Sequence, residues 1–62
     1  MRIVRPPWLV EVSVVDTWRP GFLEAWRRDG DSWLAYVRYM EGPGMRHLTW
    51  VQAQRVRLAG KF

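Results

Sequence analysis

The sequence predicts a small all-β domain in which five short antiparallel strands roll up into a barrel. Two observations support this fold: several stretches alternate apolar and polar residues, and Gly, Pro and Asp turn signals separate them at near-regular spacing. A chain of 62 residues is also too short to cover sheet edges with helices, and closing the sheet removes those edges.

The first strand is expected from residue 9 to residue 15, where β-branched apolar residues alternate with polar ones. The alternating residues are Val10, Glu11, Val12, Ser13 and Val14. Residues 1–8 form a basic leader that ends at Pro6-Pro7, because proline has no N–H group to donate to a β-ladder. Residues 16–21 are interpreted as a loop with a Pro-Gly turn.

Residues 22–28 and 33–40 fit either a strand or a short helix. Asp29-Gly30-Asp31 between them is typical of a hairpin turn, and a helix of seven residues is short to stand alone. We therefore expect two strands. In the first, one face carries Leu23 and Ala25, and the other carries Phe22, Glu24 and Trp26. In the second, one face carries Trp33, Ala35, Val37 and Tyr39, and the other carries Leu34, Tyr36, Arg38 and Met40.

The remaining elements follow from turn signals. Glu41-Gly42-Pro43-Gly44 predicts another hairpin turn, and a fourth strand follows at 46–51. A short 3₁₀ turn within 51–54 precedes a fifth alternating strand at 55–58. One barrel domain therefore spans residues 9–58, between the leader at 1–8 and a tail at 59–62.

Aromatic and basic residues carry the functional signal. Five Trp, two Tyr and two Phe are more than the interior of so small a barrel holds, so some of these rings must be exposed. The net charge is +4, and nine of the ten basic residues are Arg. This charge favours an anionic partner such as nucleic acid or an acidic protein.

Two groups of residues are candidates for binding. Exposed rings would stack on bases or enclose a cation, and guanidinium groups would neutralise phosphates. The aromatic candidates are Trp18, Trp26, Trp33, Tyr39 and Trp50, and the basic candidates are Arg27, Arg28, Arg38, Arg46, Arg55 and Arg57. Each group also has a structural alternative to a binding role. The aromatic rings could instead be core or interface residues, and the arginines could instead pair with acidic residues. The expected pairs are Arg38 with Glu24, and Arg27 or Arg28 with Asp29 or Asp31.

The sequence predicts no enzyme. His47 is the only histidine and there is no cysteine, so we expect no metal site and no cofactor. Ser13 and Ser32 have no evident base partner, and no Gly-rich phosphate loop is present. The N-terminus lacks the apolar run of a signal peptide, and no stretch is long enough to span a bilayer. We therefore expect a cytoplasmic protein with no membrane partner.

Six segments in order resemble the Tudor/Agenet branch of the SH3-like barrels, from about residue 10 to residue 58. They are Val10-Glu11-Val12, a loop carrying Trp18, Ala25-Trp26, Asp29-Gly30, Trp33-x-Ala35-x-Val37 and Arg55-Val56-Arg57. The resemblance implies a five-stranded SH3-like barrel with an aromatic cage for methylated Lys or Arg, in which Trp26 and Trp33 match two cage positions. The turn at 41–44 departs from the acidic or Asn-containing segment of that family.

Together these observations predict a non-catalytic binding module whose aromatic and Arg-rich surface binds nucleic acid or an acidic protein. The first alternative is a Tudor-like reader of a peptide or a methylated side chain. The second is a subunit of a homo-oligomer or larger assembly, in which the surplus aromatic residues are buried at an interface.

Overall fold

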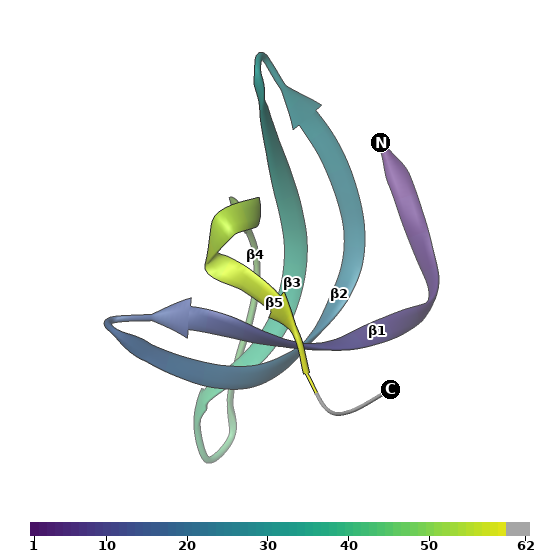
Figure 1. The fold of residues 1–62 in the computed structure, drawn as a ribbon. Coiled ribbons are helices and arrows are strands. Elements are labelled where there is room, and N and C mark those ends of the chain that lie inside the picture. The colour runs from purple at the N-terminus through teal and green to yellow at the C-terminus, as the bar shows by residue number, and fades with distance from the viewer. Residues whose placement is uncertain (60–62) are drawn as a thin grey trace.

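A computed structural model describes residues 1–59 as one five-stranded antiparallel sheet with a single 3₁₀ turn and no α-helix in that range (Figure 1). The elements are β1 (Arg2–Val14), β2 (Thr17–Asp29), β3 (Ser32–Gly42), β4 (Met45–Gln52), η1 (Ala53–Arg55) and β5 (Val56–Leu58). The predicted all-β class, the five antiparallel strands and the 3₁₀ turn before the last strand are confirmed. Apart from residue 59, the predicted tail lies outside the described residues.

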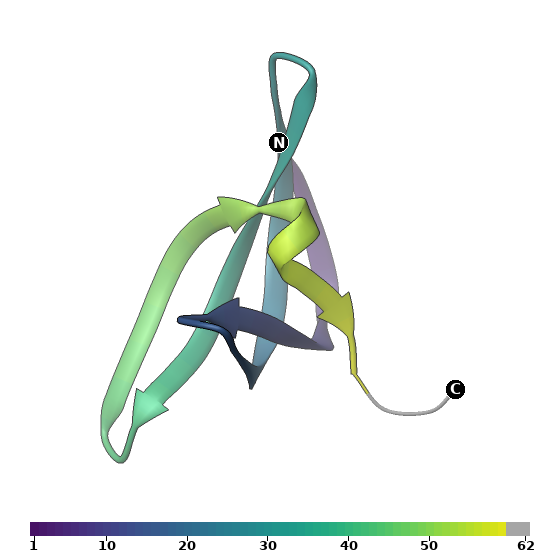
Figure 2. The same cartoon turned by 60° about the vertical axis from the view of Figure 1, so that its left-hand side comes forward.

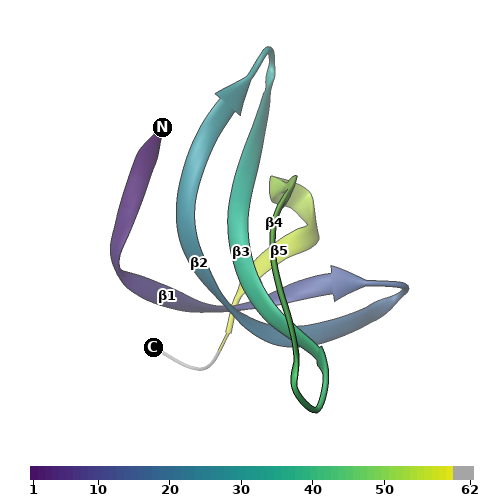
Figure 3. The same ribbon diagram turned by 180° about the vertical axis from the view of Figure 1, so that it is seen from behind.

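The order of the strands in the sheet is β4-β3-β2-β1-β5. The outermost strands, β4 and β5, do not pair with each other within residues 1–59, so the predicted closure of the barrel is not shown. The 3₁₀ turn η1 lies between them in the chain and contacts both β3 and β1. The sheet is strongly coiled, and η1 covers part of its concave side (Figures 2 and 3).

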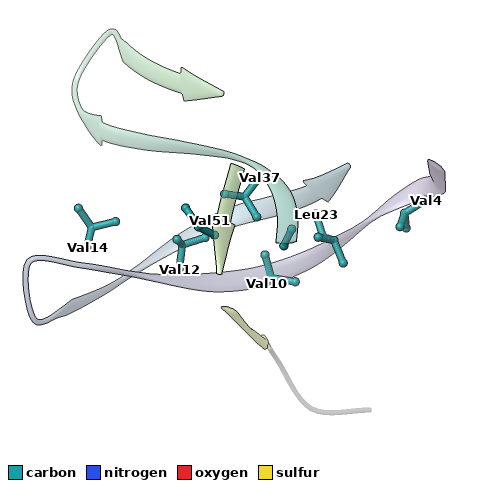
Figure 4. Close-up of a cluster of buried hydrophobic side chains, with 8 residues drawn as sticks. Val4, Val10, Val12, Val14, Leu23, Val37 and Val51 are labelled. Atoms are coloured by element: carbon teal, nitrogen blue, oxygen red, sulfur yellow. The ribbon is translucent and has the colours of Figure 1, made fainter. Parts of the chain in front are cut away.

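An aliphatic core fills the concave side of the sheet. Figure 4 shows the side chains of β1 facing those of the other strands. The core residues are Val4, Val10, Val12, Val14, Leu23, Ala35, Val37 and Val51. The alternation predicted for β1 is confirmed, because Val10, Val12 and Val14 are all buried. Among the aromatic residues in 1–59, only Trp26 and Tyr39 pack against this cluster, and both are partly buried. Most of the other rings are therefore left for the surface.

The loop predicted at 16–21 is wrong, because β2 already begins at Thr17. The actual turn is Val15–Asp16, where both residues have positive φ, 48° and 61°. Pro20 and Gly21 lie within β2 opposite β1. Proline is tolerated there because pairing of β2 with β3 begins only at Gly21, so the missing N–H group costs no bond on that side.

The predicted leader is an arm of the sheet, because β1 begins at Arg2. Arg2 pairs with Trp26, and Ile3 pairs with Ala25. The register then shifts between Ile3 and Trp8, across the Pro6-Pro7 pair that cannot donate to a ladder. Residues 1–7, which we call the N-terminal arm, therefore run beside the second half of β2 (Figure 1).

The β2–β3 hairpin forms as predicted, with strands in place of the helical alternative and a turn at Gly30–Asp31. A bulge between Leu23 and Ala25 inserts an extra residue in β2. Because a bulge reverses the alternation of side chains, Trp26 lies on the concave side, opposite Ala35. The prediction that Trp26 shares a face with Phe22 and Glu24 is therefore wrong.

Candidate functional site

The five aromatic candidates lie in four different places. Trp26 and Trp33 line one groove at the β2–β3 hairpin. Trp50 pairs with Tyr36 across β3 and β4, and their ring centroids lie 4.8 Å apart. Trp18 lies under Arg57, whereas Tyr39 stacks on His47 with centroids 5.4 Å apart. A cage built from all five rings is therefore absent.

The groove that contains Trp26 and Trp33 has a volume of about 690 Å³ and is open to solvent. Its lining comes from the N-terminal arm, the β2–β3 hairpin and η1. Figures 1 and 3 show the hairpin between the arm on one side and η1 on the other. Its lining residues are Met1, Arg2, Trp26, Arg27, Arg28, Trp33 and Ala53. We call it the indole–arginine groove, because it combines two indole rings with three guanidinium groups and no carboxylate among these lining residues.

The hairpin fixes Arg28 against Trp33. The two residues are cross-strand partners near the turn, and the Cζ atom of Arg28 lies 5.5 Å from the centroid of the Trp33 ring. Arg28 Nε also donates a hydrogen bond of 3.1 Å to the carbonyl oxygen of Gly30. The two terminal nitrogens of Arg28 make no hydrogen bond to any residue in 1–59. The Trp33 residue is 47% exposed. Both groups are therefore available to a ligand.

Arg2 lines the groove, although the sequence predicts that it belongs to a leader outside the barrel. It enters because the arm pairs with β2 and places Arg2 opposite Trp26. The pairing of β1 with β2 extends no further along β2 than Trp26, so Arg27 and Arg28, which follow Trp26, have no partner in β1. The arm therefore ends at the groove and leaves one side of both arginines uncovered.

Two of the predicted basic residues hold the last strand in place. Arg55 donates from Nε and Nη2 to the carbonyl oxygen of Ser13, at 3.0 and 2.6 Å. Arg57 places its guanidinium 3.9 Å from the centroid of the Trp18 ring, and its Nε lies 2.8 Å from Glu11 Oε1. Both arginines bind β1 or β2, so their side chains serve the fold.

Replacing Arg57 by alanine is expected to lower the free energy of unfolding by about 1 kcal/mol, since an exposed ion pair and an exposed cation–π contact each contribute less than that. Urea denaturation measures this change. Arg46→Ala is the control, because Arg46 is exposed and makes no ion pair within residues 1–59. An equal loss in both variants would contradict the structural role of Arg57.

Arg38 forms the predicted pair with Glu24, with Arg38 Nε 3.0 Å from Glu24 Oε2. The Nε–H group makes no hydrogen bond, so the contact is an ion pair without hydrogen-bond alignment. Arg38 also lies 5.0 Å from the Phe22 ring centroid. The other expected pairs, of Arg27 or Arg28 with Asp29 or Asp31, do not form within the described chain.

His47 is engaged outside the groove. Its Nε2 lies 2.6 Å from Glu41 Oε2 across the β3–β4 hairpin, and its ring stacks on Tyr39. No group of three or more His, Cys, Asp or Glu side chains in residues 1–59 is placed to hold a metal ion.

Comparisons with protein-family models, with curated proteins and with solved structures found no match to this chain. Within residues 1–59, no helix has the length and apolar character needed to cross a membrane.

Proposed function

We propose that this chain is a non-catalytic module that binds single-stranded nucleic acid in the indole–arginine groove. The observation that carries the proposal is the composition of the groove: two indole rings and three arginines, with no carboxylate among the lining residues that the structure describes. Unpaired bases stack on indole faces, and guanidinium groups neutralise phosphates. This ligand satisfies both kinds of side chain at once.

The groove offers little to a methylated lysine or arginine. A methylated side chain is itself a cation, and Arg2, Arg27 and Arg28 already place three positive charges in the lining, which repel a cation and attract a phosphate. An acidic peptide would pair with the arginines and leave the indole rings without a stacking partner. The charge and the rings therefore favour nucleic acid over both alternatives.

The strand order supports our proposal that the fold is an SH3-like barrel of the Tudor/Agenet kind. Each strand pairs with its neighbour in the chain, except that β5 returns to pair with β1 after the 3₁₀ turn. Because η1 contacts both β3 and β1, it links the two sides of the coiled sheet. The proposal that the module is not an enzyme is supported by His47, which pairs with Glu41 and does not line the groove.

Fluorescence titration with a twelve-nucleotide single-stranded oligonucleotide tests the proposed function. We expect salt-sensitive binding that Trp33→Ala weakens about 10-fold, because stacking of one base contributes about 1–3 kcal/mol. Trp8→Ala is the matched control: Trp8 is 50% exposed, compared with 47% for Trp33, but lies outside the groove. We expect this variant to bind like the wild type.

Three parallel titrations separate the alternatives. Tighter binding to poly-glutamate than to the oligonucleotide would indicate an acidic protein partner, and preferential binding to a trimethyl-lysine peptide would indicate a Tudor-like reader. Preference for duplex DNA would contradict stacking on unpaired bases. If no ligand binds and the sedimentation mass rises with protein concentration, the module is an assembly subunit.

A further inference from the structure

We infer that a second base-stacking site adjoins the indole–arginine groove, at Tyr36 and Trp50, so that the ligand is an oligonucleotide that occupies two successive sites. This inference rests on the proposed function and specifies its substrate: a chain of at least two nucleotides, bound on both sides of the N-terminal arm.

The second site is a groove of about 600 Å³ between the N-terminal arm and the convex side of β2, β3 and β4. Its lining residues are Met1, Ile3, Val4, Arg5, Pro7, Glu24, Ala25, Tyr36 and Trp50. We call it the outer groove. The Tyr36 and Trp50 rings are cross-strand partners tilted by 39°. Neither residue belongs to the buried core, and together they form an aromatic wall of the groove.

Arg27 connects the two grooves. It lines the indole–arginine groove, and its Cζ atom lies 4.7 Å from the centroid of the Trp50 ring, which lines the outer groove. Met1 lines both grooves, so they meet where the arm ends. A phosphate that links a base at Trp33 to a base at Trp50 would therefore pass beside the Arg27 guanidinium.

The charges of the outer groove suit the same ligand. Glu24 supplies the one carboxylate among the lining residues in 1–59, and its Oε2 is already 3.0 Å from Arg38 Nε. Arg5 also lines the groove and makes no ion pair within the described residues. Neutralisation of Glu24 by Arg38 leaves Arg5 and Arg27 to set the local charge, which favours a second phosphate.

A series of thymidine oligonucleotides from one to eight nucleotides tests this inference, with binding followed by amide chemical shifts in NMR spectra. We expect Trp50→Ala to weaken binding of the six-nucleotide chain about 10-fold and to leave thymidine monophosphate binding at the indole–arginine groove unchanged. Trp33→Ala is expected to weaken both ligands. Trp50→Phe keeps a ring for stacking and should retain most of the affinity for the longer chain.

The outcomes distinguish the two proposals. If Trp50→Ala weakens the mononucleotide and the six-nucleotide chain equally, or changes neither, the second site is excluded and single-site binding remains. If the wild type binds no oligonucleotide of any length, the proposed function itself fails. Retained binding of the mononucleotide by Trp50→Ala also shows that this variant is folded.

Discussion

Gly21→Ala is expected to lower the free energy of unfolding by about 1–3 kcal/mol, a large part of what holds so small a domain folded. A Cβ atom at this position would lie 2.6 Å from the backbone carbonyl oxygen of Arg38 and 3.0 Å from Tyr39 Cβ. The nearest obstacle is backbone, so β2 and β3 would have to separate where Gly21 pairs with Tyr39. Overpacking of this kind costs about 1–3 kcal/mol, and the core of so small a domain rarely supplies more than about 3–5 kcal/mol.

Far-ultraviolet circular dichroism during thermal and urea denaturation measures this loss. Gly42→Ala is the matched control, because Gly42 lies in β3 and the nearest atom to its added Cβ would be Met45 Sδ at 4.0 Å. We expect the control to change the free energy of unfolding by less than about 0.5 kcal/mol. Equal stability of the two variants would show that β2 does not approach Arg38 closely at Gly21.

The same glycine shows where sequence reasoning reaches its limit. A Pro-Gly pair is a strong local turn signal, and it predicted a loop at 16–21. Gly21 is instead required by the backbone of β3, which lies far along the chain. No local pattern reveals such a cross-strand contact. Alternation, by contrast, is a property of one strand, so the buried face of β1 and the shared face of Ala35 and Val37 were predicted correctly.

The candidate site was predictable in part for the same reason. The resemblance to Tudor modules singled out Trp26 and Trp33, and these two rings do line one groove. The sequence could not show that Arg2 reaches that groove, since the pairing of the arm with β2 resumes only across an interruption at Pro6-Pro7. Nor could it separate Arg28, which faces the groove, from Arg57, which is bound to Glu11. That distinction depends on which strands become neighbours.

Replacing Arg2, Arg27 and Arg28 together by glutamine is expected to weaken binding of the twelve-nucleotide oligonucleotide about 100-fold at 0.1 M salt. Each phosphate neutralised on a single strand contributes about 0.7 to the slope of log K against log salt. Loss of three contacts should therefore make that slope shallower by about 2. Titrations at four salt concentrations between 0.05 and 0.4 M, a range chosen to resolve such a slope, measure both quantities.

Arg46→Gln is the control for charge alone. Arg46 is exposed on β4, lies outside both grooves and carries the same charge. If binding depends only on the overall positive charge, the triple variant will lower log K by no more than three times the change that Arg46→Gln produces. If it depends on phosphates held in the grooves, Arg46→Gln will leave the slope nearly unchanged, because only a contact that releases counterions enters it. Equal slope changes per arginine would therefore overturn the assignment of these three residues to the site.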